Sequence, residues 1–213
     1  HADCLADYYH VDVFSEEHWK ILENYFKEYV KRGCNMMLTP LFTSPLDTAV
    51  GLERTTTQLI KVEVVKGEYR FEFSELKRWI DLCKKCGIEY YEMSHLFSQW
   101  GAKYAPKVVA EVDGKEEKIF GWHTPAVGEY TRFLKAFLPQ LIEKLKEWNI
   151  DQVTYFHISD EPREEHLESY RVAKESLGNM LDGFHTFDAL SSYEFYRHGL
   201  IDKPIPGNNE IEE

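Results

Sequence analysis

SELKRWIDLCKKCGIEYYEMSH, residues 74–95, is the stretch that decides the fold, because it contains a helix, the end of that helix and a strand. Its apolar residues recur at the spacing of one face of an α-helix: Leu76, Trp79, Ile80 and Cys83. Two lysines and Gly87 then mark a helix C-terminus, where basic side chains and glycine are favoured. The apolar run after Gly87 is typical of a short buried strand. The stretch therefore predicts one unit in which a helix leads into a strand.

The same unit recurs along the chain. Helices are expected to begin at Ser15, at Ser74, ahead of Phe133 and near Pro162. Strands are expected at residues 4–9, 34–40, 88–95, 151–159 and 183–190. Strict alternation of strands and helices predicts a parallel sheet with right-handed crossovers.

The closure of this sheet decides the fold class, and two closures fit the pattern: an open doubly wound sheet and a (β/α)8 barrel. No GxGxxG or GxxxxGK[ST] motif follows a predicted strand, so the nucleotide-binding form of the open sheet has no support. Polar and aromatic residues gather where the strands end, which is where barrel enzymes carry their active sites. We therefore expect an α/β fold of the (β/α)8 TIM-barrel type over residues 1–213. We expect it to be incomplete, because about five units are recognisable and residues 203–213 form a polar tail rich in turn residues.

Two insertions interrupt the alternation. Residues 57–73 alternate apolar and polar side chains on both sides of Lys66-Gly67, which predicts a β-hairpin. Residues 97–124 form a long loop with a predicted turn at Asp113-Gly114. Both insertions are expected on the rim that carries the site, where a barrel builds its specificity.

Charge and composition exclude several classes of partner. The chain has 25 basic and 37 acidic residues, a net charge of −12, which argues against nucleic acid as a partner. No apolar run has the length of a membrane span, and no signal peptide is visible in this chain, so localisation is left open between cytoplasmic and secreted. Cys83 and Cys86 have the spacing of a redox or zinc motif, but no second pair completes a zinc site. All four cysteines are expected to be packed thiols.

Asp160-Glu161-Pro162, after the apolar run that ends at Ser159, is the candidate catalytic motif. The structural alternative is a helix start, since acidic residues and proline are favoured there. Glu161 would then be the cap, and glutamate is not a preferred cap. A carboxylic acid beside an ionised carboxylate suits glycoside hydrolysis. Adjacent positions do not suit the usual pair that flanks the scissile bond, but they suit a reaction in which the 2-acetamido group of the substrate is the nucleophile.

Five segments together resemble one known family. They read LTPLFTSPLDT (38–48), SHLFSQWGAKYAPK (94–107), FGWHT (120–124), FLPQL (137–141) and FHISDEP (156–162). In this order they resemble the catalytic domain of glycoside hydrolase family 123, over nearly the whole chain. The resemblance implies a (β/α)8 barrel without a cofactor. It also implies an N-acetyl-β-galactosaminidase acting on glycans or glycolipids, with N-acetylgalactosamine favoured over N-acetylglucosamine.

The same resemblance implies a retaining, substrate-assisted mechanism through an oxazolinium intermediate. Glu161 would be the general acid and then the base, and Asp160 would orient and polarise the acetamido group. Two features depart from the family. No β-sandwich precedes the barrel in this chain, and His123 stands where an acidic residue is expected.

Seven further residues are predicted to contact the substrate: Arg54, His95, Gln99, Trp100, Trp122, His157 and Asp188. Several have an alternative role. Trp100 and Trp122 either stack on a sugar face or hold the long loop. His157 is either a satisfied core histidine or a substrate contact, and Asp188 is either a ligand or a cap.

Arg54 has a planar guanidinium that matches vicinal hydroxyl oxygens, but it could instead pair with Asp47 across its own loop.

Two rival functions remain beside the glycosidase. A metal-dependent hydrolase could use His95, His157 and Asp160, and it would lose activity with a chelator. A carbohydrate-binding remnant without turnover would leave a chromogenic hexosaminide intact. Self-association is expected at the open side of the incomplete barrel.

Overall fold

The structure is a computed structural model that describes residues 1–46, 48–190 and 192–207. Its helices are α1 (Ala2–Tyr9), α2 (Glu16–Lys31), α3 (Ser74–Cys86), α4 (Glu129–Glu147), α5 (Leu167–Ser176) and α6 (Glu194–Arg197), with 3-10 turns η1 (Asp151–Val153) and η2 (Glu164–His166). Its strands are β1 (Met36–Thr39), β2 (Lys61–Val65), β3 (Glu68–Glu72), β4 (Tyr90–Met93), β5 (Val108–Val112), β6 (Lys115–Phe120), β7 (Thr154–His157), β8 (His185–Leu190) and β9 (Lys203–Pro206).

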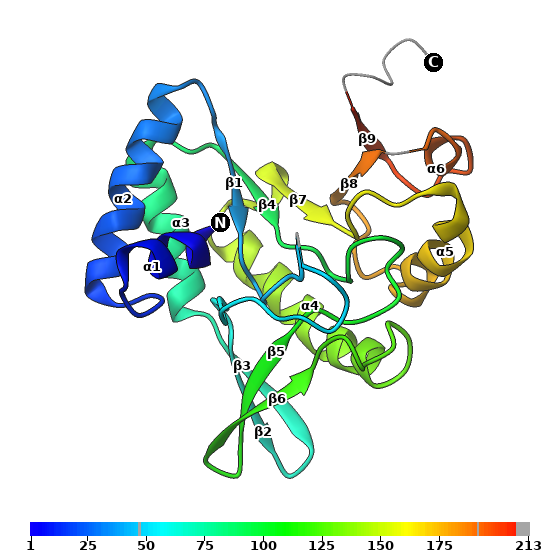
Figure 1. Cartoon of the computed structure of the whole chain (residues 1–213), viewed down its shortest axis with the longest axis horizontal. Coiled ribbons are helices and arrows are strands. Elements are labelled where there is room, and N and C mark those ends of the chain that lie inside the picture. The colour runs from blue at the N-terminus through cyan, green and yellow to red at the C-terminus, as the bar shows by residue number, and fades with distance from the viewer. Residues whose placement is uncertain (47, 191, 208–213) are drawn as a thin grey trace.

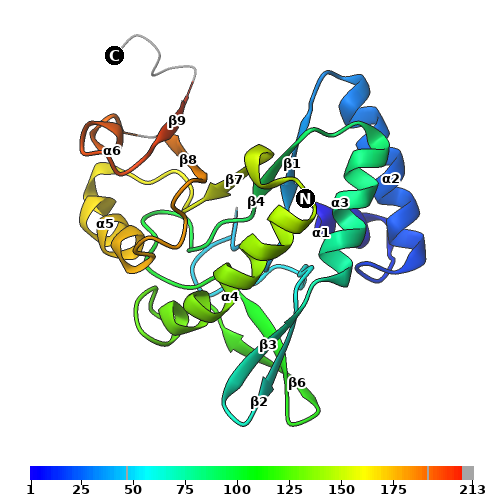
Figure 2. The same cartoon turned by 180° about the vertical axis from the view of Figure 1, so that it is seen from behind.

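The main sheet is parallel, as the alternation predicts, and its strands are neighbours in chain order, β1-β4-β7-β8-β9 (Figure 1). The register pairs Met36 with Tyr90, Tyr91 with Thr154, Tyr155 with His185 and Phe187 with Lys203. The sheet is not closed, because β1 and β9 are its two edges. The chain is thus a mixed α/β domain with a parallel sheet. Figure 2 shows α4 crossing the main sheet, with α2 and α3 beside its β1 edge.

The two insertions form a second, smaller sheet of order β3-β2-β5-β6, which projects from the main sheet in both views (Figures 1 and 2). Both predicted turns are confirmed. Lys66 and Gly67 connect β2 to β3, and Asp113 and Gly114 connect β5 to β6, all four with positive φ. This conformation matches the twist of a two-residue hairpin, which favours asparagine, aspartate and glycine.

Helix boundaries follow the signals in the sequence. The hydroxyl of Ser15 accepts the His18 N–H at 3.2 Å and caps α2. Gly87 ends α3 with a φ of 94°, a left-handed conformation that glycine adopts at little cost. The predicted stripes are buried in one core, to which α3 contributes Leu76, Trp79, Ile80 and Cys83.

Two predictions of secondary structure are wrong. Residues 4–9 were expected to form a strand but belong to helix α1, in which Asp3 and Ala6 are buried three positions apart. A run this short cannot be assigned to helix or strand from its periodicity. Strand β9 lies instead in the tail, where Pro204 and Pro206 argue against a strand. Proline is nevertheless tolerated in an edge strand, and β9 is one.

Because residues 4–9 are helical, the candidate motif follows a different strand in the count, but it still lies at a strand end. Asp160 follows β7, the third strand of the main sheet rather than the fourth. The helix expected near Pro162 begins later, since the turn η2 precedes α5 at Leu167.

The described cysteines are all free. Cys83 is buried and Cys34 and Cys86 are half-buried, as expected of packed thiols, whereas Cys4 is exposed. No helix in the described ranges is both long and apolar enough to span a membrane.

A cavity of about 400 Å³ lies between α1, α2 and the edge strand β1, lined largely by apolar side chains.

Candidate active site

Two loops run side by side at the C-terminal ends of β4 and β7. Three backbone hydrogen bonds join them: Leu96 N–H to His157 O at 3.0 Å, Phe97 N–H to Ile158 O at 3.0 Å, and Trp100 N–H to Asp160 O at 2.8 Å. The hydroxyl of Ser159 adds a fourth bond by donating to the carbonyl of Ser98 at 2.8 Å. The backbone that carries Asp160 is therefore fixed against the loop after β4.

Both loops contain residues in the left-handed region. Glu161 has a φ of 41°, and Trp100, Gly101 and Ala102 have φ values of 57°, 108° and 55°. Positive φ is uncommon outside glycine, and at Glu161, Trp100 and Ala102 it costs on the order of 1–3 kcal/mol each. Strained backbone of this kind clusters at functional sites. Asp160 is half-buried and Glu161 is exposed, so the pair borders solvent.

Asp188, within β8, lies beside the segment that leads into this pair. Its side chain has no exposed area, and it accepts three hydrogen bonds. His157 Nε2 reaches Oδ1 at 2.8 Å, while the Ser159 N–H and the Tyr170 hydroxyl donate to Oδ2 at 3.0 and 2.7 Å. The carboxylate is thus satisfied and joins β8, α5 and the segment that leads into Asp160.

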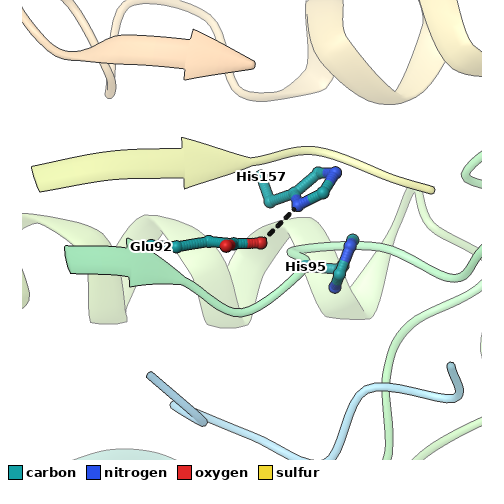
Figure 3. A group of neighbouring side chains, drawn as sticks. All are labelled: Glu92, His95 and His157. Carbon is teal, nitrogen blue, oxygen red and sulfur yellow. Dashed lines mark hydrogen bonds and ion pairs between the residues drawn. The ribbon is translucent and has the colours of Figure 1, made fainter. Parts of the chain in front are cut away.

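His157 lies between two carboxylates. Its Nδ1 is 2.9 Å from Oε1 of Glu92, the contact drawn in Figure 3, and its Nε2 faces Asp188. Burial alone would lower the pKa of His157, but Asp188 and then Glu92 outweigh it and raise the pKa to about 9. At neutral pH the ring is therefore an imidazolium that donates from both nitrogens.

His95 lies against this imidazolium. The ring centroids of His95 and His157 are 3.7 Å apart, with the planes inclined by 38°. Neither nitrogen of His95 has a hydrogen-bond partner among the described residues, although the side chain is only 4% exposed. Burial, and secondarily the charge of His157, lower the pKa of His95 well below its usual value. His95 is therefore neutral, and its two ring nitrogens are buried polar atoms next to His157.

Glu92, His95 and His157 each offer a possible metal ligand, and these atoms lie within 4.8 Å of one another (Figure 3). The arrangement fits a metal poorly. Two imidazoles on one tetrahedral zinc, with Zn–N near 2.0 Å, have ring centroids roughly 5 Å apart, and here they are 3.7 Å apart. Both nitrogens of His157 also face carboxylates. Asp160, which the sequence offered as a third ligand, is not a member of this group.

Arg54 is engaged away from Asp160. Its guanidinium donates to Asp3 from Nε at 2.7 Å and from Nη2 at 3.0 Å, and from Nη1 to the carbonyl of Leu46 at 2.8 Å. Asp47, the alternative partner, lies outside the described residues. This geometry links the loop that carries Arg54 to α1, and it engages all three nitrogens of the guanidinium.

The two candidate tryptophans differ in exposure. Trp122 is 8% exposed, and its indole N–H donates to the carbonyl of Leu52 at 2.8 Å, so it holds the long loop in place. Trp100 is 38% exposed and has a free surface at the rim. Gln99 donates to the carbonyl of Thr48 at 2.8 Å. His123 is exposed.

The structure thus gathers His95, His157, Asp160 and Asp188 at neighbouring strand ends. Glu92 and Tyr170 complete their contacts. Glu92 is among the polar residues expected at the strand ends, but neither residue was predicted to belong to the site. Glu92 lay within a predicted strand, and Tyr170 lay on the apolar stripe of a predicted helix. A carboxylate in a short buried strand was the available signal for Glu92, because such a charge needs a partner.

Comparisons with known proteins agree with this architecture. A family model described as "Glycoside hydrolase 123, catalytic domain" matches residues 1–213. Comparison with curated proteins gave no match. Among solved structures, the chain is similar to a family 123 glycoside hydrolase from Clostridium perfringens, whose structural analysis concerned glycolipid glycan hydrolysis. The TM-score is 0.69 at 21% identity, and the match covers 98% of this chain and 37% of that chain. At this identity, the likeness to the solved structure shows the fold alone.

Proposed function

Since the chain belongs to the family of glycoside hydrolase 123 catalytic domains, we propose that it removes terminal β-linked N-acetylhexosamine, with N-acetylgalactosamine preferred, from glycans or glycolipids. The reaction retains configuration and uses the substrate's own acetamido group as the nucleophile. One observation carries the assignment of the site. Glu161 follows Asp160 in a strained left-handed conformation, on a segment hydrogen-bonded to the loop after β4.

The two carboxyl groups divide the work. Asp160, half-buried and fixed through its backbone, orients the acetamido group and stabilises the positive charge of the oxazolinium that forms. Glu161, exposed beside it, protonates the glycosidic oxygen as the bond breaks and then removes a proton from the incoming water. One residue can serve as acid and then as base because the second step reverses the proton transfer of the first.

The remaining candidates surround this pair. Trp100 presents a partly exposed ring for a sugar face. The nitrogens of His95, which have no partner among the described residues, exchange hydrogen bonds with a sugar hydroxyl. Gln99 lies one residue before Trp100 in the same loop. Trp122 and Arg54 hold their loops in place, and His157 and Asp188 support the segment that leads into Asp160. We also propose that the open parallel sheet, whose five strands follow chain order, is an incomplete barrel of the (β/α)8 type.

The experiment compares two chromogenic substrates that differ only at carbon 2. The chain should hydrolyse an N-acetyl-β-galactosaminide and should not hydrolyse the β-galactoside with a plain hydroxyl, because that substrate lacks the nucleophile. A thiazoline analogue of the oxazolinium should inhibit. Efficient cleavage of the 2-hydroxy sugar would show that the nucleophile belongs to the protein.

A second candidate is a carbohydrate-binding domain without turnover, favoured by the open sheet with its two free edges. The cavity beside β1 makes that edge the expected surface for self-association. Saturable binding of N-acetylgalactosamine without hydrolysis would select this candidate. Sedimentation of the chain as a dimer would support association through β1.

A further inference from the structure

Asp188 reaches the catalytic segment from a neighbouring strand. It belongs to β8, and its Oδ2 accepts the backbone N–H of Ser159 at 3.0 Å, one residue before Asp160. The contact is made by a side chain with no exposed area. It therefore fixes the backbone at Ser159, whose hydroxyl is bound separately by the loop after β4.

The charge of Asp188 is balanced by His157, and that of Glu92 is balanced by the same ring. Two buried or half-buried carboxylates with one imidazolium between them form a stable arrangement only while the proton stays on the ring. A neutral imidazole donates one hydrogen bond, not two. Loss of the proton would leave one carboxylate facing a ring nitrogen without a hydrogen.

We propose that Glu92, His157, Asp188 and Tyr170 form a positioning unit, which holds Ser159 and thereby places Asp160 and Glu161 for the reaction. This inference rests on the proposed function. Neither His157 nor Asp188 is a direct substrate contact, because both nitrogens of His157 and both oxygens of Asp188 already have partners. The unit draws its members from β4, β7, β8 and α5, so the catalytic segment is held by three strands and a helix.

The positioning unit requires a protonated His157, and the groups that face this ring determine the pH at which it loses its proton. They are Glu92 from β4, Asp188 from β8 and the neutral His95 from the loop after β4, with Phe187 as an uncharged neighbour. Tyr170 acts on the same site through Asp188. We expect kcat to fall as the pH rises through about 9, the pKa of His157, while KM stays nearly constant.

Two measurements test the unit without any assay of activity. Nitrogen-15 NMR of the whole chain should show protons on both ring nitrogens of His157 at pH 7. Hydrogen exchange at the Ser159 amide should be faster in Tyr170→Phe, which removes one donor to Asp188, and in Asp188→Asn, which leaves one acceptor oxygen for three donors. Roughly 3- to 10-fold faster exchange is expected for Tyr170→Phe.

Matched controls are available nearby. Tyr196→Phe changes an exposed tyrosine of α6. Asp202→Asn changes an aspartate that accepts a hydrogen bond from the hydroxyl of Thr186, which lies in β8 two residues before Asp188. Both should leave the Ser159 exchange rate unchanged. If Asp188→Asn does not fold, Tyr170→Phe still tests the proposal, because it leaves every charge in place.

Kinetics then separate positioning from substrate contact. On an N-acetyl-β-galactosaminide, Tyr170→Phe should lower kcat roughly 3- to 10-fold with KM unchanged. A raised KM with unchanged kcat, a neutral His157 at pH 7, or unchanged Ser159 exchange in both variants would each overturn the proposal. If the wild-type chain hydrolyses no hexosaminide while the NMR and exchange results hold, the proposed function fails and the positioning of Ser159 stands.

Discussion

The rings of His95 and His157 lie against each other with their centroids 3.7 Å apart and their planes inclined by 38°, one neutral and one protonated at neutral pH. This stacking brings the two imidazoles closer than a shared metal ion would hold them. Prolonged dialysis against EDTA should therefore leave activity and melting temperature unchanged. Loss of activity that zinc restores would contradict this account of the pair.

Leaving-group dependence should distinguish the two carboxylates. Glu161→Gln should reduce turnover of substrates with poor leaving groups by roughly 10²–10⁴-fold, because the proton donor is gone, and should affect nitrophenyl substrates much less. Asp160→Asn should reduce both kinds of substrate alike, since it acts on the acetamido nucleophile. Glu165→Gln, an exposed neighbour, is the control. Equal losses for Glu161→Gln across all leaving groups would rule out its role as the acid.

The stability of the protein should fall at alkaline pH because of His157. Its pKa in the folded protein is about 9, above the ordinary 6.5, so its stabilising effect is complete below about pH 6.5 and is lost as the pH rises through 9. The difference corresponds to roughly 3 kcal/mol. Urea unfolding between pH 6 and 10 measures it. Glu92→Gln should shift the decline to lower pH, and an unchanged profile in that variant would contradict the assignment.

Gly101 should not tolerate a side chain. A Cβ at this position would lie 2.7 Å from Cγ of His166, and the φ of 108° is unfavourable for any other residue. We expect Gly101→Ala to lower the free energy of unfolding by about 1–3 kcal/mol. Gly114→Ala is a matched control, because Gly114 also has a positive φ but nothing within 4 Å of an added Cβ. Similar losses in the two variants would show that the contact with His166 is unimportant.

Arg54 should matter for stability more than for substrate affinity. Arg54→Lys keeps the charge but loses the two-point contact with Asp3, which is buried. We expect a loss of about 1–3 kcal/mol in the free energy of unfolding, with KM unchanged. A KM raised tenfold without a change in stability would instead identify Arg54 as a substrate contact.

Local signals predicted most of the fold. The stripe that ends at Gly87 and the turns at Lys66-Gly67 and Asp113-Gly114 are set by neighbouring residues, so the sequence reveals them. Strand β9 and helix α1 were missed because tertiary contacts determine them. The position of Asp160-Glu161 at a strand end could be predicted for the same local reason. The bond from Asp188 to Ser159 joins residues 29 positions apart, and no local pattern predicts it.

Helix α1 has a consequence for the order of folding. Its Asp3 and Asp7 bind Arg54 and Thr55, which are 51 and 48 residues further along the chain. A helix of eight residues is marginal by itself in water, and contacts between distant residues form slowly. Helix α1 is therefore among the last elements to reach its place, and it stays unfolded until the loop around Arg54 has been made.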